Sequence, residues 1–398
     1  MRFSKKIQSC GLSPMRKFHP FAVAAAAAGK KIYHLNIGQP DIETPQAFFD
    51  AVQRFQAPVL EYAPSAGVTS LIRAVQGYYR KLGVELPEYG IQATTGGSEA
   101  LSMVMGCILD EGDEILVPEP FYPNYDTFVN MSGGTIKPIH TTPEEGYHYA
   151  DRERIEPLIT DRTRAILVTN PGNPTGAVLT RQEMRLLADI AKEHDLFLVS
   201  DEVYREFVYD DPTLCSMLEF EDAAEQVIVV DSVSKRFSAC GARVGLLLSR
   251  NRELMDQAMK LCQGRLCSAT LDQIGAAALY SVGPDYFDAV REEYHRRRDT
   301  CMEGLMKIPG VVCEYPRGAF YLMAKLPVDD TDKFQQWLLT DFDHPDGTVM
   351  FAPGESFYAT PGKGRDEVRL AYVICQEDLK KAMEILGAAI RAYPGRTI

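Results

Sequence analysis

The sequence has 398 residues, too many for one ordinary core, so we expect two domains or one large α/β domain with an appendage. Hydrophobic residues make up 45% of the chain and charged residues 24%, values that exclude wholesale disorder. The net charge of −13 argues against a nucleic acid or an anionic membrane as partner, but it leaves room for a small anionic ligand in a local basic pocket.

The N-terminal segment places basic residues before the Ala-rich stretch FAVAAAAAG at 21–29. This order resembles a signal peptide, but the apolar part is short and Ala is the best helix former, so a short surface helix is favoured. No run approaches the roughly 20 apolar residues that span a bilayer. The nine cysteines include no C-x-x-C pair, which favours buried free thiols in a reducing compartment. We therefore expect a cytoplasmic protein.

Short apolar strands alternate with helical patterns between residues 91 and 250. This alternation indicates a mainly parallel sheet covered on both faces, whose ligands lie beyond the carboxyl ends of the strands. The expected strands lie at 91–95, 114–120, 164–171, 196–204, 226–234 and 243–249, and the expected helices at 99–109 and 182–194.

The pattern changes after residue 250 to an α+β type. Helical patterns cover 251–263, 270–281, 284–307 and 377–392, and apolar segments lie at 318–326, 334–339, 348–354 and 367–373. We expect residues 1–44 to form an N-terminal arm and part of a small domain, 45–285 a large ligand-binding domain, and 286–398 the rest of the small domain.

Polar clusters follow several of these strands. Gly97 and Ser98 lie in TTGGSEA, where a glycine turn before a helix suits an anion, although such a turn is often only structural. Asn173 in NPGNPTG can donate a hydrogen bond, or it belongs to a plain turn. Asp201 in SDEVY follows an apolar strand, with Tyr204 three residues later. A buried carboxylate there needs a cation or hydrogen bonds, whereas a solvated one does not.

The segment DSVSKRFSACGARVG at 231–245 brings Lys235 to a strand end between Ser232 and Ser234, with Arg243 eight residues further on. Hydroxyls, a lysine and an arginine together suit a phosphate monoester that also carries a carbonyl, because lysine forms Schiff bases. Arg369 lies within the apolar EVRLAYV. It favours a bidentate anion such as a carboxylate, or alternatively a buried ion pair.

These motifs resemble those of the class I/II aminotransferases of pyridoxal phosphate (PLP) fold type I, in particular the bacterial aspartate aminotransferase subgroup. NPGNPTG, SDEVY and SxSKxFSxxGxRxG occur in the family's order, and the resemblance runs from about residue 12 to 390. Supporting strings are NIGQPDIETP, EYAPSAG, TGGSEAL, PEPFYPNY and PRGAFY. The resemblance implies an α/β large domain with a mainly parallel seven-stranded sheet between helices, a smaller α+β domain, and PLP as cofactor.

The resemblance also implies roles for single residues. Lys235 would form the Schiff base with PLP and move the substrate proton, Asp201 would pair with the pyridine nitrogen, and Tyr204 with Asn173 would contact the phenolic oxygen. Tyr122 would stack on the ring, unless it only packs at the surface. Tyr62 would reach the phosphate in the neighbouring subunit of a homodimer. The phosphate would be held by Gly97, Ser98, Ser232, Ser234 and Arg243.

Arg369 would bind the substrate α-carboxylate beside Asn173 and the backbone of Gly38. The expected reaction is ping-pong transamination between an L-amino acid and 2-oxoglutarate, with aspartate favoured, then alanine or an aromatic amino acid. Some relatives carry Lys where this chain has Ser98, which puts a dicarboxylate in doubt. Arg16 in SPMRKF is our candidate for binding a distal carboxylate. The alternative is that Arg16 and Lys17 are simply two basic surface residues near the dimer interface. Arg265 is the second candidate.

A PLP-dependent lyase or synthase, such as a C–S lyase, remains the alternative, because the same carbanion serves all these reactions. A non-enzymatic regulator on this fold is disfavoured, since all the catalytic positions are filled. No Walker, zincin or G-x-S-x-G motif is found, and we expect no metal.

Overall fold

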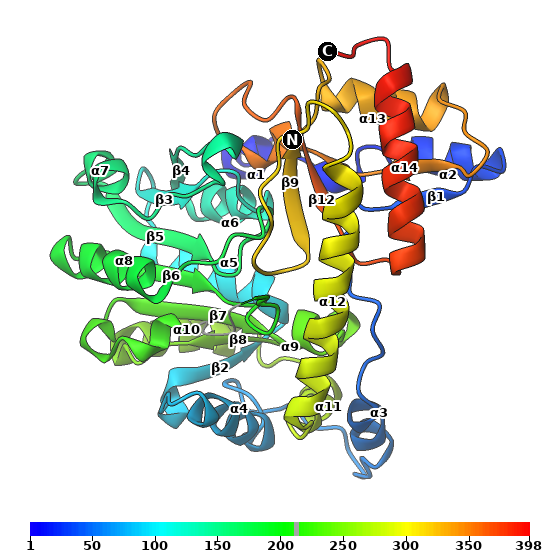
Figure 1. The fold of residues 1–398 in the computed structure, drawn as a ribbon. Helices are drawn as coiled ribbons and strands as arrows, with labels where there is room; N and C mark the ends of the chain where they lie inside the picture. Colours follow the sequence, from blue (N-terminus) through cyan, green and yellow to red (C-terminus); the bar gives the residue numbers. More distant parts are fainter. Residues whose placement is uncertain (211–214) are drawn as a thin grey trace.

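The computed structural model describes residues 1–210 and 215–398. Its main sheet has seven strands in the order β2-β8-β7-β6-β5-β3-β4 (Figure 1). All neighbours are parallel except β8, which is antiparallel to β2 and to β7. The mainly parallel sheet is therefore confirmed. Its strands are β2 (Ile91–Thr94), β3 (Glu114–Pro118), β4 (Thr135–Ile139), β5 (Thr163–Thr169), β6 (Phe197–Asp201), β7 (Val227–Ser232) and β8 (Gly245–Leu248).

The sequence did not predict strand β4. Lys137 and Pro138 interrupt its apolar run, and proline lacks the N–H that a central strand needs. The strand lies at one edge of the sheet, where only one neighbour, β3, pairs with it.

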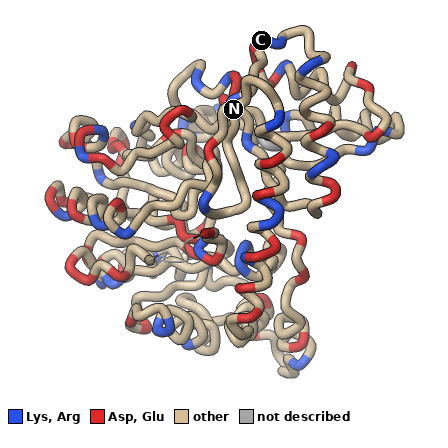
Figure 2. The backbone as a smooth tube through the Cα atoms, in the orientation of Figure 1, with Lys and Arg blue, Asp and Glu red and all other residues tan. Residues whose placement is uncertain are grey.

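Helices cover both faces of this sheet. One face packs against α5 (Gly96–Ile108), α6 (Asn124–Ser132) and α10 (Arg252–Gly264). The other packs against α4 (Thr69–Lys81), α8 (Arg181–Glu193) and α11 (Thr270–Leu279). Because both faces are covered, every residue of β7 is buried, including the two polar ones at its end. Figure 2 shows both signs of charge interspersed along the outer helices.

The C-terminal part forms a second layer with its own core. The antiparallel sheet β11-β12-β9 packs with three helices, and the long α12 runs beside both layers (Figure 1). The elements are β9 (Tyr321–Lys325), β11 (Ala352–Pro353), β12 (Glu367–Ala371), α12 (Pro284–Leu305), α13 (Thr331–Thr340) and α14 (Gln376–Ala392).

The N-terminal segment packs on this second layer. Strand β1 (Ile32–His34) pairs in parallel with β10 (Thr348–Met350), and α2 (His19–Ala27) lies against α13. The Ala-rich stretch is therefore a short helix, as expected. The domain limits at residues 44 and 285 stay predictions.

Among the described residues, no helix has both the length and the apolar character needed to cross a membrane. All nine cysteines are free, but the expected burial holds fully for only three of them, Cys215, Cys262 and Cys301. Cys375 is exposed, because it lies at the solvent-facing start of α14, and the other five are partly buried.

Candidate active site

A cavity of about 370 Å³ lies at the carboxyl ends of β6 and β7, beneath residues of β9 and β12. It brings together thirteen of the fifteen site residues predicted from the sequence, and Tyr62 and Arg265 lie outside it. Its predicted wall residues are Arg16, Gly38, Gly97, Ser98, Tyr122, Asn173, Asp201, Tyr204, Ser232, Ser234, Lys235, Arg243 and Arg369.

Lys235 reaches the cavity from α9 (Val233–Arg236), a single helical turn directly after β7. Ser232 caps this turn, because its Oγ accepts from Ser234 N at 3.1 Å. The Lys235 Nζ donates to Gly38 O at 2.9 Å, and Cys240 Sγ lies 4.0 Å from the same Nζ. The amine is thus directed toward the segment that follows β1.

Asp201 ends β6 with its carboxylate in the cavity wall. Its Oδ2 accepts from Tyr125 Oη at 2.7 Å and its Oδ1 from Val203 N at 3.3 Å. Burial raises the pKa of Asp201 to about 6, and these two hydrogen bonds offset only part of that effect. No cation forms an ion pair with this carboxylate among the residues that the structure describes. The site therefore suits a ligand that presents a cationic N–H group.

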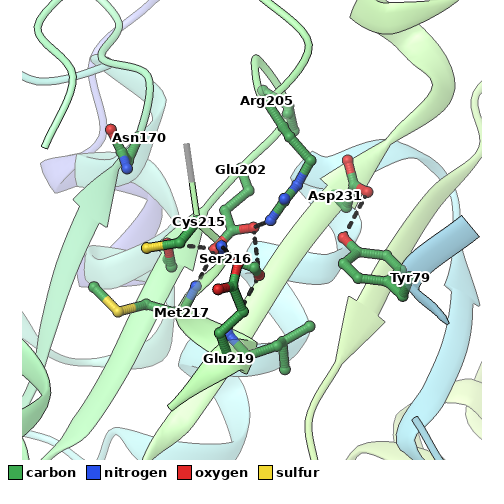
Figure 3. A network of polar contacts seen from close by, with 12 residues as sticks. Tyr79, Asn170, Glu202, Arg205, Cys215, Ser216, Met217, Glu219 and Asp231 are labelled. Atoms are coloured by element: carbon green, nitrogen blue, oxygen red, sulfur yellow. Dashed lines mark hydrogen bonds and ion pairs between the residues drawn. The ribbon is translucent and has the colours of Figure 1, made fainter. Parts of the chain in front are cut away.

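Two further acids, one directly after β6 and one within β7, face the opposite side of the sheet, because side chains alternate along a strand. Glu202 is buried against Arg205 and accepts from Ser216 Oγ at 2.8 Å (Figure 3). Asp231 pairs with Arg236 at 2.5 Å. Asp201 and Lys235 therefore each adjoin a residue held by an ion pair in the core.

The same network links the two ion pairs through α4. Tyr79 Oη donates to Asp231 Oδ2 at 2.9 Å, as Figure 3 shows, and the Arg205 guanidinium lies 5.6 Å from the Tyr79 ring centre. Strands β6 and β7 are thus fixed to one helix just below the cavity.

A second group of residues surrounds the start of α5. Gly96 has φ +75°, and a Cβ there would lie 2.3 Å from Arg243 Nη2. A Cβ on Gly245 would lie 2.3 Å from the Gly96 carbonyl carbon. Glycine at both positions lets Arg243 and β8 approach the helix N-terminus closely. Free N–H groups, the Ser98 hydroxyl and a guanidinium together suit a phosphate.

Arg369 and Asn173 connect the two layers of the molecule at the cavity. The Arg369 Nη1 donates to Asn173 Oδ1 at 3.0 Å, and its Nη2 donates to Asn36 O at 2.7 Å. Asn173 Nδ2 donates to Tyr204 Oη at 3.4 Å. The backbone carbonyl beside Arg369 is thus that of Asn36, whereas the carbonyl of Gly38 faces Lys235.

Sequence reasoning missed two tyrosines of this site. Tyr125 bonds Asp201, and Tyr321 lines the cavity and contacts Tyr204 Oη at 3.0 Å. Both lie in strings that carried the resemblance, PEPFYPNY and PRGAFY. Tyr122 lines the cavity, where burial raises its pKa to about 12.

The two candidate cations for a distal carboxylate lie in different places. Arg16 lines the cavity. Arg265 does not, because its Nε pairs with Glu99 at 2.9 Å and its Nη2 donates to Ala93 O at 2.6 Å. Tyr62 is 80% exposed on this chain. Arg16 is therefore the remaining candidate for binding a distal carboxylate, and Tyr62 is accessible to another molecule.

Taken together, the donor set fits PLP. One end of the cavity offers N–H, hydroxyl and guanidinium donors for a phosphate, the middle offers a buried carboxylate for a pyridine N–H, and Lys235 projects into the same space. Its volume lies within the ordinary range for sites of small ligands.

Comparison with known proteins agrees with this chemistry. The family model "Aminotransferase class I and II" matches residues 30–386. The aspartate aminotransferase of Bacillus subtilis is 30% identical over 96% of this chain and 98% of its own length. The aspartate/prephenate aminotransferase of Thermus thermophilus is 32% identical over 97% and 99%. A solved structure of the Thermus thermophilus aspartate aminotransferase with maleate has a TM-score of 0.87 at 30% identity, covering 98% of this chain and 100% of that one.

The fold and the cavity define a PLP-binding α/β enzyme of fold type I. The chain belongs to the class I and II aminotransferases. It is a PLP-dependent aminotransferase that acts on amino acids and 2-oxo acids.

Proposed function

We propose that this aminotransferase transfers the amino group of L-aspartate to 2-oxoglutarate in a ping-pong cycle. The observation that carries the proposal is that, besides Arg243 at the phosphate end, two further arginines, Arg16 and Arg369, line the cavity into which Lys235 projects. Guanidinium groups bind carboxylates in bidentate fashion, so two of them match the two carboxylates of a dicarboxylic substrate. The aspartate aminotransferases among the relatives support the same choice.

In this proposal Arg369 holds the α-carboxylate and Asn173 keeps the guanidinium in place through its 3.0 Å hydrogen bond. Arg16 holds the distal carboxylate. Binding at both ends fixes the substrate so that its Cα–H bond points at Lys235. Such positioning makes a large contribution to rate because it removes the entropy of alignment before the reaction.

The cofactor would be held by the residues named above. Gly97, Ser98, Ser234 and Arg243 bind the phosphate, with Ser232 supporting Ser234, and Asp201 pairs with the pyridine nitrogen. Tyr204 and Asn173 contact the phenolic oxygen, and Tyr122 stacks on the ring. When bound, PLP supplies electron withdrawal from the substrate Cα.

Lys235 is the base for the substrate Cα proton in this proposal. Its Nζ donates to Gly38 O at 2.9 Å, a contact open to the amine whenever it is not bound to the cofactor. General bases of this kind contribute roughly 10²–10⁴-fold to rate.

We also propose that the enzyme is a homodimer in which Tyr62 reaches the phosphate of the neighbouring site. The 80% exposure of Tyr62, next to the exposed Val59 and Leu60, supports this role. An apolar surface of this kind is typical of a protein interface.

A single-turnover spectrum tests the proposed reaction. The PLP-loaded enzyme is mixed with L-aspartate in the absence of any 2-oxo acid, and the visible absorbance of the cofactor is followed. We expect stoichiometric conversion to the pyridoxamine form and recovery on addition of 2-oxoglutarate. No conversion with aspartate, but conversion with alanine or an aromatic amino acid, would reject the dicarboxylate. Steady release of a 2-oxo acid without a second 2-oxo acid would favour the lyase alternative.

A further inference from the structure

Tyr321 lies at the centre of the contacts that join the three functional groups of the cavity. Its Oη is 3.0 Å from Tyr204 Oη and 3.5 Å from Gly38 O. The Arg369 guanidinium lies 4.5 Å from its ring centre. The side chain is 2% exposed and projects from the first residue of β9. Tyr321 thus contacts the Tyr204 hydroxyl, the Arg369 guanidinium and the Gly38 carbonyl that accepts from Lys235.

The Gly38 carbonyl has two possible donors, Lys235 Nζ at 2.9 Å and Tyr321 Oη at 3.5 Å. Gly38 is partly buried, and its carbonyl is less stable without a donor. When the Lys235 amine turns from Gly38 into the cavity, Tyr321 is the remaining side chain among these contacts that can donate to this carbonyl.

A tyrosine hydroxyl has only one proton to donate. If Tyr321 donates to Gly38 O, its oxygen can accept from Tyr204. If instead it donates to Tyr204, then Tyr204 has its own proton for another acceptor, and Gly38 O accepts from Lys235. The two arrangements differ by small hydroxyl rotations, and each one leaves the Gly38 carbonyl with one donor.

We propose that Tyr321 is a positioning residue that exchanges its hydrogen bond between Gly38 O and Tyr204 Oη as the Lys235 amine leaves or returns to Gly38. The proposal rests on the proposed roles of Lys235 and Tyr204 at the cofactor. When the amine leaves Gly38 O, Tyr321 replaces it as the donor, so the Gly38 carbonyl keeps one hydrogen bond. The exchange also strengthens Tyr204 as a donor while Lys235 rests on Gly38.

The absence of a side chain at Gly38 allows this contact. A Cβ there would lie 1.7 Å from Tyr321 Oη and 2.3 Å from its Cζ, so any larger residue must displace the tyrosine ring. A substitution at Gly38 therefore displaces Tyr321 by steric contact, and it provides a second, independent way to disturb the same exchange.

Y321F tests the proposal because it removes only the hydroxyl. The holoenzyme is titrated between pH 5 and 10, following the visible absorbance of bound PLP, and kcat and KM are measured with the best amino-acid substrate. One lost net hydrogen bond, about 0.5–1.5 kcal/mol, corresponds to roughly 0.4–1 pH unit. We expect the absorbance pKa to fall by that amount, because Lys235 is bound to PLP and away from Gly38 in the titrated enzyme, so Tyr204 no longer donates to Tyr321 and can donate to the cofactor instead. We also expect kcat to fall about 10-fold with KM changed less than about threefold. G38A should shift the absorbance pKa in the same direction.

Y209F is the matched control. Tyr209 is also buried and its hydroxyl donates to the Ala319 carbonyl two residues from Tyr321, but it does not line the cavity. We expect Y209F to leave the absorbance pKa and kcat unchanged. An absorbance pKa that is unchanged in Y321F, or equally shifted in Y209F, would overturn the proposal. The absorbance titration needs no substrate, so it decides this question even if aspartate proves not to be a substrate.

Discussion

Arg236 Nη2 donates to Asp231 Oδ1 at 2.5 Å, with both side chains fully buried. Arg236 directly follows Lys235, and Asp231 directly precedes Ser232, so this ion pair closes the turn that presents the lysine. A four-residue helix has little stability of its own, because helix formation needs a costly nucleus. The position of Lys235 therefore depends on a contact on the far side of the sheet.

Removing one partner of this pair should strongly destabilise the fold. R236M leaves Asp231 buried without its cation, and we expect a loss of about 3–5 kcal/mol in the free energy of unfolding, measured by urea denaturation. The double variant D231N/R236M should lose less than R236M, since it leaves no uncompensated charge. The control is R252M, which breaks the exposed Arg252–Asp256 pair and should cost under about 1 kcal/mol. Equal losses in R236M and R252M would show that burial of the pair is unimportant.

Asp201 should make the stability of the PLP-free protein depend on pH. Burial raises the pKa of its carboxyl to about 6 from the ordinary value of 3.8, so the folded state keeps this proton at pH values where the unfolded state has lost it. Stability is therefore greater below about pH 4 and falls as the pH rises to about 6. Two pKa units correspond to roughly 3 kcal/mol.

D201N isolates this contribution, because the amide does not titrate. Urea denaturation of wild type and D201N between pH 4 and 7 should show the stability of the wild type falling relative to the variant as the pH rises. Other groups cancel in the difference between the two proteins. Parallel curves for the two proteins would mean that Asp201 titrates normally in the fold.

The residues that end buried strands could be predicted from the sequence. Asp201 comes at the end of a strand that begins with the apolar run LFLV, Lys235 comes shortly after the apolar run VIVV, and Arg369 lies inside an apolar strand, so their type and position alone indicated a site. The main sheet followed from the same apolar runs. Of its strands, only the edge strand β4 was missed, because Lys137 and Pro138 interrupt its apolar pattern.

The contacts between distant segments could not be predicted. Gly38 lies in an irregular stretch after β1, and its proximity to Lys235 and Tyr321 depends on how the two layers pack. For the same reason the sequence did not distinguish Arg16 from Arg265. Only the fold shows that Glu99 already pairs with Arg265.

Tyr62 should affect PLP binding only through a second subunit. In sedimentation equilibrium we expect a dimer at micromolar concentration. Y62F should raise the dissociation constant of PLP by about 10-fold, since a hydrogen bond to a charged group contributes about 1.5–3 kcal/mol. Y315F, which changes a different exposed tyrosine, should leave PLP affinity unchanged. A monomer that binds PLP tightly, or an unaltered affinity in Y62F, would reject the shared site.

Arg16 should determine which amino acid the enzyme prefers. R16A removes the guanidinium but leaves Arg369 and Lys235 in place, so only substrates with a distal carboxylate should suffer. We expect kcat/KM for aspartate to fall about 10- to 100-fold, the equivalent of one charge-assisted hydrogen-bonding group, while kcat/KM for alanine changes less than about twofold. R16K should recover part of the loss, because lysine keeps the charge without the bidentate geometry.

The neighbouring Lys17 provides the matched control, since its amine pairs with Asp332 at 3.0 Å and it does not line the cavity. K17A removes the same charge from the same segment, and it should leave both substrates unaffected. If K17A and R16A lowered aspartate turnover equally, the effect would be a general one of charge near the entrance. If neither variant changed it, the distal carboxylate would be bound elsewhere, and Ser98 would be the next position to vary because it lines the same cavity.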